Sequence, residues 1–255
     1  IAAQTYRQSG LDYWPGPLTG GTSGGDASTG AETCEVWNKM FKINKTEIDA
    51  FLADFSDGTL DNAQNYPNVL NWPAVGNPNN PLWVDADGNI LEAFRPDGTV
   101  LYAAPFVDVD GNPLEYNPAA GDYPDIQGDQ AIWWIVNDKG NAHTETGGQP
   151  IGVEIHMLAF AFTTANAVND MTFYRQTVIN RSSQRLNETF IGQWVDADLG
   201  TFNDDYVGCD TLLGLGFAYN GDDNDDGGSA YGLNPPAVGV DFFLGPLADP
   251  NDVID

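Results

Sequence analysis

The second half of the chain alternates between short apolar runs of strand length and polar, glycine-rich turns. Alternation with a period of two residues is typical of β-strands that bury one face. Near Met157 the alternation changes phase, which predicts either a bulge or a strand that is buried on both faces. The expected strands span residues 131–136, 151–162, 171–181, 189–195, 212–219 and 237–244.

One segment instead carries the period of an amphipathic helix, near residues 45–56. Its apolar side chains recur at positions i, i+3, i+4 and i+7, which form one stripe on a helix. Asn44 is a suitable N-cap, with Glu47 placed to complete a capping box, and Gly58 is placed to end the helix in a left-handed conformation. The stripe consists of Ile48, Phe51, Leu52 and Phe55.

These elements predict a mainly β fold, an antiparallel β-sandwich-like domain with long acidic loops and one helix. The 29 Gly and 16 Pro among 255 residues are consistent with many turns. We expect an extended N-terminal arm over residues 1–33 and a single β-rich domain over 34–246. Residues 247–255 resemble the start of a linker to a further C-terminal region.

The net charge of −28, from 37 acidic and 9 basic residues, limits the partners that the chain can bind. Such a chain would be repelled by nucleic acids and by anionic membranes, so neither is an expected partner. No apolar run approaches the ~20 residues of a membrane span. The charge has three possible explanations, namely bound divalent cations, an acidic surface for solubility, or adaptation to high salt. The excess of Asp over Glu favours calcium, whose sites commonly use Asp.

Two short acidic repeats present oxygen ligands at alternate positions, as calcium-binding loops do. The first contains Asp85, Asp87 and Asn89, and the second contains Asp108, Asp110 and Asn112. Both depart from the EF-hand because their glycine is fourth and the twelfth residue is not Glu, so ordinary Asp-Gly turns are the alternative. Further candidate ligands are Asp122, which follows the second repeat, and Asp196, Asp198, Asp204 and Asp205, which precede Cys209.

The two cysteines, Cys34 and Cys209, are far apart in sequence and match neither a zinc motif nor a redox pair. In an exported protein they could form a disulfide, which is the interpretation we favour. The alternative is two buried free thiols.

Aromatic residues in a loop rich in Pro and Asn, Tyr66, Trp72 and Trp83, provide an alternative function as a carbohydrate-binding module. Exposed rings on loops can stack on sugars, although such rings more often cover the core beneath a loop.

An active site is difficult to identify. The two histidines, His143 and His156, do not belong to a recognisable catalytic motif. A secreted glycoside hydrolase with paired carboxylates is a third possibility, although these aspartates occur in solvated turns rather than in an apolar pocket that would raise a carboxyl pKa.

Several strings of the chain are distinctive: residues 104–138 (beginning APFVDVDG), 150–155 (PIGVEI), 171–183 (MTFYRQTVINRSS), 191–222 (beginning IGQWVDADLG) and 234–246 (NPPAVGVDFFLGP). They resemble segments of large secreted proteins of Bacteroidetes and related phyla, a largely uncharacterised family. That family commonly carries a C-terminal signal for the type IX secretion system, so the resemblance implies an extracellular or outer cell-surface location. Asp210-Thr211-Leu212 also resembles the O-glycosylation site used in Bacteroidetes, in which Thr211 would carry the glycan.

The function that we favour from sequence is a non-enzymatic structural or adhesive protein, such as a subunit of a surface layer, sheath or filament. Calcium in the acidic loops would stiffen it, and no organic cofactor is expected. The expected partners are further copies of the same chain or other cell-surface proteins, with glycans as a possible addition.

Overall fold

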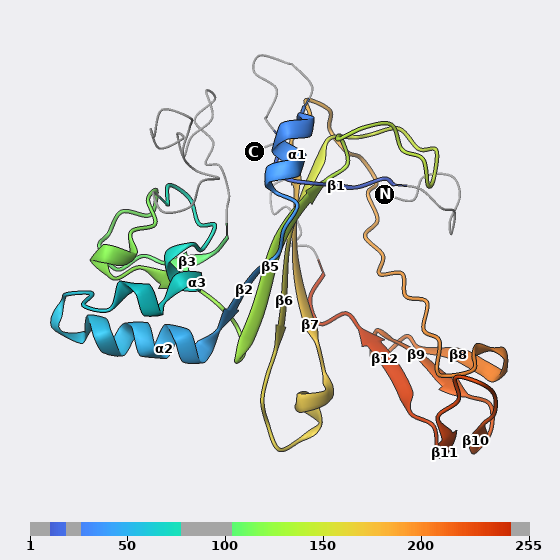
Figure 1. Ribbon diagram of the computed structural model, residues 1–255. Coiled ribbons are helices and arrows are strands. Elements are labelled where there is room, and N and C mark those ends of the chain that lie inside the picture. The colour runs from blue at the N-terminus through green and yellow to red at the C-terminus, as the bar shows by residue number, and fades with distance from the viewer. Residues whose placement is uncertain (1–10, 19–26, 78–103, 246–255) are drawn as a thin grey trace. The chain divides into compact units, whose positions relative to one another are not determined.

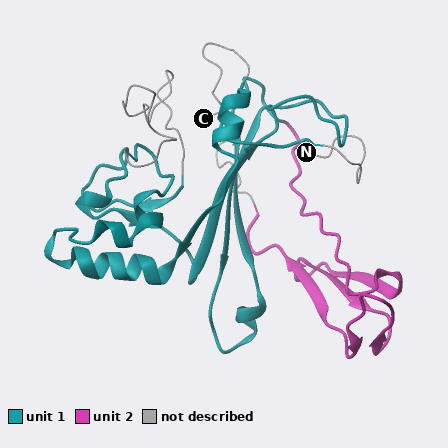
Figure 2. Cartoon of the chain, in the orientation of Figure 1, with its two compact units in different colours: residues 1–186 teal, residues 187–255 magenta. Residues whose placement is uncertain are grey.

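The computed structural model describes residues 11–18, 27–77 and 104–245, and the chain forms two compact units. Unit 1 is residues 1–186 and unit 2 is residues 187–255 (Figure 2). This division differs from the single domain expected over residues 34–246. Strands account for 28% and helical segments for 18% of the described residues, and the sheets are antiparallel, which confirms the mainly β fold class.

Unit 1 is built on a five-stranded antiparallel sheet. Its central strand β5 (Gln130–Asn137) pairs on one side with β6 (Val153–Ala161), which pairs in turn with β7 (Phe173–Asn180). On its other side, β5 pairs near one end with β2 (Phe41–Asn44) and near the other with β1 (Trp14–Pro15) (Figure 1). The strands expected over residues 131–136, 151–162 and 171–181 are therefore confirmed, with small shifts at their ends.

The register of β6 explains the change of phase near Met157. Each residue of β6 has one partner in β5 and one in β7, without interruption, so the strand carries no bulge. Leu158 is buried on one face of the sheet, whereas Val153 is buried on the other. The second of the two sequence interpretations, a strand buried on both faces, is therefore correct.

One face of the sheet packs against helices and loops to form the core of unit 1. The covering layer contains α2 (Lys45–Asp54), α3 (Pro67–Leu70) and the loops on either side of them (Figure 1). Trp133 in the middle of β5 contacts the rings of Trp37, Phe41 and His156. The buried residues are Trp37, Ile43, Ile48, Phe51, Tyr66, Val69, Trp72, Ala74, Val75, Ala104, Tyr116, Ala131, Trp133, Ile135 and Leu158.

Helix α2 occupies the segment that the apolar stripe predicts, with Ile48 and Phe51 buried. The 3-10 turn η2 (Phe55–Asp57) extends it, and Gly58 ends the turn with φ of 88°, as expected. The expected capping box is wrong. Asn44 Oδ1 instead accepts a hydrogen bond from Gln130 Nε2, and Glu47 accepts two from Asn68.

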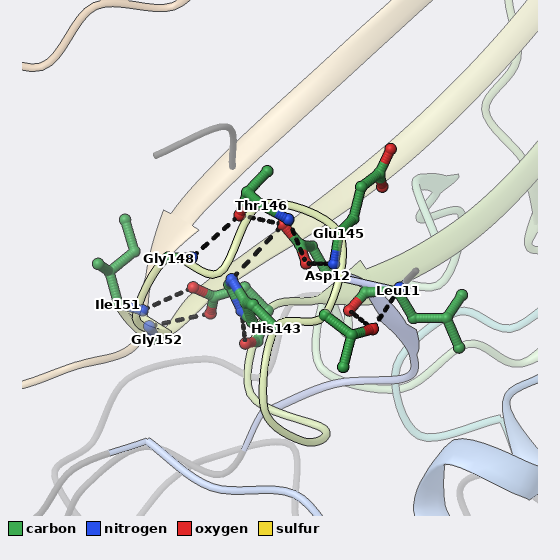
Figure 3. Close-up of polar contacts among 10 residues, drawn as sticks. Leu11, Asp12, His143, Glu145, Thr146, Gly148, Ile151 and Gly152 are labelled. Carbon is green, nitrogen blue, oxygen red and sulfur yellow. Dashed lines mark hydrogen bonds and ion pairs between the residues drawn. The ribbon is translucent and has the colours of Figure 1, made fainter. Parts of the chain in front are cut away.

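The described part of the N-terminal arm is fastened to the sheet by buried polar groups. Asp12 is 3% exposed and accepts hydrogen bonds from the backbone of Glu145 and Thr146 and from Thr146 Oγ1 (Figure 3). Farther along, the backbone N–H of Leu18 donates to Glu154 Oε2 over 2.6 Å. Residues 11–18 are therefore an integral part of unit 1, rather than a separate arm.

Smaller elements complete unit 1. The pair β3 (Phe106–Val107) and β4 (Tyr123–Pro124) is antiparallel and holds a long acidic loop. The remaining short helices are α1 (Ala31–Val36), η3 (Ala63–Asn65), η5 (Pro118–Ala120) and η6 (Ala167–Asp170). None of the helices in the described residues is long and apolar enough to cross a membrane.

Unit 2 contains a three-stranded antiparallel sheet in the order β12-β9-β8, formed by β8 (Asp205–Asp210), β9 (Leu215–Asn220) and β12 (Ala237–Asp241). The 3-10 turn η7 (Phe202–Asp204) precedes β8, and β10 (Asn224–Asp225) pairs with β11 (Gly232–Leu233). The strand expected over residues 189–195 is wrong, because that segment forms no strand and pairs with none among the described residues. Residues 205–210, where no strand was expected, form β8.

Candidate metal centre

The acidic loop of residues 108–122 is closed at its base by the β3–β4 pair. Val107 lies opposite Tyr123 in this pair. Asp108 directly follows β3 and Asp122 directly precedes β4, so continuing the register brings these two carboxylates to opposite sides of the same loop entrance. Residues that are 14 positions apart in the sequence therefore become neighbours.

The first turn of the loop fixes the direction of Asp108 and Asp110. Asp108 Oδ1 accepts hydrogen bonds from the backbone N–H groups of Gly111 and Asn112, and Asp110 Oδ1 accepts one from Asn112. Gly111 has φ of 86°, a left-handed conformation that glycine adopts without strain. The loop is thus an Asp-Gly turn that also has the spacing of calcium ligands, so these two interpretations of the sequence do not exclude each other.

Asp122 is the buried member of the site, with 0% of its surface exposed. Its Oδ1 accepts a hydrogen bond of 2.8 Å from Val109 N, and its Oδ2 accepts one of 2.8 Å from Asn117 N. Burial raises the pKa of this carboxyl group, the two backbone donors oppose the rise, and the charges of Asp110 and Asp108 add to it. A third carboxylate is therefore held against two others at a cost in free energy.

Asp108, Asp110 and Asp122 each place a carboxylate oxygen within 4.8 Å of the other two, the one such group of three within the described ranges. No salt bridge from a Lys or Arg to these carboxylates occurs in the part of the chain that the structure describes. Three converging oxygens without a cationic partner are a donor set that suits Ca²⁺, which binds oxygen ligands at about 2.3–2.6 Å in flexible geometry. The residues present thus fit the expected ion.

The other residues of the two repeats are placed differently. Asn112 contributes its backbone N–H to the turn, and its amide nitrogen donates to Glu115 Oε2, so it organises the loop from the exposed side. Asp85 and Asp87 lie outside the described residues.

The candidate ligands Asp196, Asp198, Asp204 and Asp205 belong to unit 2 and do not form a second group of three converging carboxylates among the described residues. Asp196 and Asp198 are exposed. Asp205 Oδ2 accepts a hydrogen bond from Leu199 N over 2.8 Å.

Another acidic turn was not identified as a ligand motif from the sequence. Asp222, Asn224 and Asp226 alternate and are followed by Gly227, which is the opening pattern of a calcium-binding loop. In the structure, Asn224 N donates to Asp222 Oδ1 and Asn224 Nδ2 donates to Asp226 Oδ1. The alternation itself was the signal that could have identified this turn.

Cys34 and Cys209 are free thiols, so the expected disulfide is not formed in the structure. Cys34 is half-buried on α1 in unit 1, and Cys209 is exposed on β8 in unit 2. The two residues thus belong to separately folded parts of the chain.

Two of the three aromatic residues proposed to bind carbohydrate are not available for stacking. Tyr66 and Trp72 are 7% and 1% exposed, and both belong to the hydrophobic core. Trp72 Nε1 donates to the backbone oxygen of Pro105, which satisfies its polar group inside the core. Trp83 lies outside the described residues. Covering the core, the alternative considered for such a loop, is therefore the observed role of Tyr66 and Trp72.

Both histidines are buried and hydrogen bonded. His143 Nε2 lies 2.7 Å from the backbone oxygen of Asp138, and His156 Nε2 lies 2.9 Å from Glu154 Oε1 (Figure 3 shows His143). Glu154 also accepts a hydrogen bond of 2.7 Å from Arg181 Nη2. Although burial opposes its ionisation, the contacts with His156 and Arg181 hold the pKa of Glu154 below its ordinary value. These groups fasten β6, β7 and residue 18 together.

Thr211, the candidate glycosylation site, is exposed in the turn between β8 and β9.

Comparison of the chain with protein-family models, curated proteins and solved structures found no match.

Proposed function

We propose that this chain is a non-enzymatic structural protein of the cell exterior whose acidic loops are stiffened by calcium. The observation that carries the proposal is the burial of Asp122 beside Asp108 and Asp110. Buried carboxylates are normally paired with a cation or protonated. A calcium ion supplies the missing positive charge and joins both ends of the loop.

The environment of the polar groups supports a structural role. The buried side chains of Glu154, His156 and Arg181 form hydrogen bonds with one another that join strands. The Asp12 carboxylate accepts hydrogen bonds that anchor residues 11–18. These contacts stabilise the fold at places where an enzyme would keep reactive groups accessible.

An extracellular location is supported by the sequence resemblance to secreted Bacteroidetes proteins and fits with calcium, which is far more abundant outside cells. Calcium sites of extracellular modules commonly have dissociation constants of about 10⁻⁴–10⁻³ M. The partners proposed are further copies of this chain or other surface proteins.

Isothermal titration calorimetry with CaCl₂ and MgCl₂ tests the ion assignment. We expect wild-type protein to bind Ca²⁺ in the range given above, and to bind Mg²⁺ at least ~10-fold more weakly, since Mg²⁺ requires near-ideal octahedral geometry. The Asp108→Asn, Asp110→Asn double variant should lose one bound calcium ion. Equal binding of calcium by the wild-type protein and the double variant would contradict the proposal.

A further inference from the structure

Unit 2 has a charge composition that provides no cationic side chain for its carboxylates. Residues 187–255 contain fourteen acidic residues and no Lys, Arg or His. A buried carboxylate needs a cationic side chain or a metal ion to offset the cost of leaving water. Since no side chain of this unit carries a positive charge, a cation from solution would have to supply the counter-charge.

Unsatisfied oxygens are concentrated in this unit. Among the described residues, seven buried side-chain polar atoms lack a hydrogen-bond partner, and four of them lie in unit 2. All four are oxygens, which is the ligand type of a hard cation. They are Thr201 Oγ1, Asp204 Oδ1, Asp205 Oδ1 and Asn220 Oδ1.

Two of these oxygens belong to residues that face each other across the sheet. Asp205 in β8 is the register partner of Asn220 in β9, so their side chains project from the same face, with Cβ atoms about 4.5–5.5 Å apart. Asn220 is 8% exposed, and its unpaired oxygen is buried. A residue with a buried, unpaired amide oxygen thus lies opposite a residue with a buried, unpaired carboxylate oxygen.

The second polar atom of each side chain, Asp205 Oδ2 and Asn220 Nδ2, is held by a hydrogen bond. These bonds fix the orientation of the two unpaired Oδ1 atoms. Asp205 Oδ2 accepts a hydrogen bond from Leu199 N, and Asn220 Nδ2 donates one of 3.1 Å to the backbone oxygen of Asp222. Turning the Asn220 amide over would place its oxygen against that carbonyl oxygen, so the orientation with Oδ1 unpaired is the favourable one.

The same turn is attached to a second buried carboxylate. Thr201 N donates to Asp225 Oδ1, so residues 199–201 link Asp205 to Asp225. Gly200 has φ of 74°, and a side chain there would overlap the Asp225 carboxylate. The backbone of this turn is therefore built closely around two acidic groups.

We propose a second calcium site in unit 2, with Asp205 Oδ1 and Asn220 Oδ1 as side-chain ligands and water or backbone oxygens completing the coordination. The inference rests on the proposed function in taking calcium as the ion, and it adds a site whose residues are independent of the Asp108–Asp122 loop. Its role is to hold the start of β8 against the end of β9.

Calorimetry on the full chain, stripped of metal and titrated with CaCl₂, tests this site. We expect Asp205→Asn to bind one calcium ion fewer than the wild-type protein. The matched control is Asp223→Asn, which makes the same charge change at an exposed residue of the neighbouring turn and should bind as the wild type does. Calcium should also slow amide hydrogen exchange at residues 199–205 and 220–225 in the wild-type protein at least ~3-fold.

A second variant keeps the test decisive if Asp205→Asn folds poorly. Asn220→Asp retains an oxygen ligand and adds a negative charge, so it should bind calcium several-fold more tightly at this site. Unchanged stoichiometry in Asp205→Asn, together with unchanged exchange in the wild-type protein, would overturn the inference and indicate that water alone satisfies these oxygens. If the Asp108→Asn, Asp110→Asn double variant binds as many calcium ions as the wild-type protein while Asp205→Asn binds one fewer, the first site is refuted and this one is supported.

Discussion

Asp122 and Val109 lie on opposite sides of one acidic loop, and the backbone N–H of Val109 donates a hydrogen bond of 2.8 Å to Asp122 Oδ1. This contact holds a fully buried carboxylate next to the first turn of the loop, where Asp108 and Asp110 are fixed by backbone donors of their own. The loop is thus folded around converging negative charge, and a cation is the group that would relieve the repulsion.

Replacing Asp122 by Asn separates the charge of this residue from its shape. We expect Asp122→Asn to weaken calcium binding at the loop at least ~10-fold, because one anionic ligand is lost while the volume is kept. Calcium titration followed by calorimetry measures this effect. The control is Asp125→Asn, which removes an exposed charge three residues away. Equal losses in the two variants would assign the effect to net charge alone.

The Glu154 carboxylate should be among the most important polar groups for the stability of unit 1. It accepts hydrogen bonds from Leu18 N and Arg181 Nη2 and lies 2.9 Å from His156 Nε2, with 0% exposure. We expect Glu154→Ala to lower the free energy of unfolding by about 3–5 kcal/mol, because it leaves Arg181 buried without its partner. Urea denaturation measures this, and Glu35→Gln on the exposed side of α1 is the control. A loss below ~1 kcal/mol would mean that water replaces the carboxylate.

The lowered pKa of Glu154 also predicts a pH dependence. In the unfolded chain the group titrates near its ordinary value of 4.5, and in the folded unit it stays ionised to lower pH. Its contribution to stability is therefore fully present above pH 4.5 and is lost as the pH falls through the lowered folded-state value. The stability difference between wild-type protein and Glu154→Gln, measured from pH 3 to pH 7 in steps of about half a unit, should shrink towards acid pH. A difference that grows towards acid pH would contradict this account.

The attachment of residues 11–18 depends on a hydroxyl group. Thr146 Oγ1 donates a 2.5 Å hydrogen bond to Asp12 Oδ2, 134 positions away in the sequence (Figure 3). We expect Thr146→Val to reduce stability by about 0.5–1.5 kcal/mol and to speed proteolytic release of the N-terminal segment. Thr163→Val, at an exposed threonine, serves as the control. Identical proteolysis of both variants would show that strand pairing alone retains this segment.

The free thiols can be counted directly. Cys209 is exposed on β8 and Cys34 is half-buried on α1. We expect a thiol reagent such as DTNB to label Cys209 rapidly in the native protein and to label both cysteines after denaturation without reductant. The Cys209→Ser variant should lose the fast phase. Absence of labelling in denaturant would instead indicate a disulfide, as the sequence suggested.

Local patterns in the sequence predicted the elements whose stability depends on local burial. The apolar run of β5, the alternation in β6 and the stripe of Ile48 and Phe51 in α2 were sufficient to locate these elements. The prediction failed at residues 189–195, which are rich in strand-forming side chains but pair with no strand among the described residues, since pairing depends on where other strands lie. It failed at the Asn44 cap for a similar reason, because Gln130 on the neighbouring strand occupies the amide oxygen.

The candidate site was likewise predictable only where it depends on local sequence. The spacing of Asp108 and Asp110 was visible in the sequence, and Asp122 was named as a ligand that follows in the same loop. Its complete burial and its two backbone donors depend on the β3–β4 pair, two strands of two residues each that no periodic pattern marks. Similarly, Asp205 and Asn220 become neighbours only through the register of β8 and β9.

Thermal unfolding in calcium and in EDTA tests the central claim most directly. With a dissociation constant of about 10⁻⁴–10⁻³ M, 10 mM CaCl₂, roughly 10–100 times that constant, should stabilise unit 1 by about 1.4–2.7 kcal/mol and raise its Tm by roughly 3–10 °C relative to EDTA. The Asp108→Asn, Asp110→Asn double variant should show less than about a third of this rise. A wild-type Tm that is the same in calcium and in EDTA would contradict a calcium-stiffened loop at Asp122.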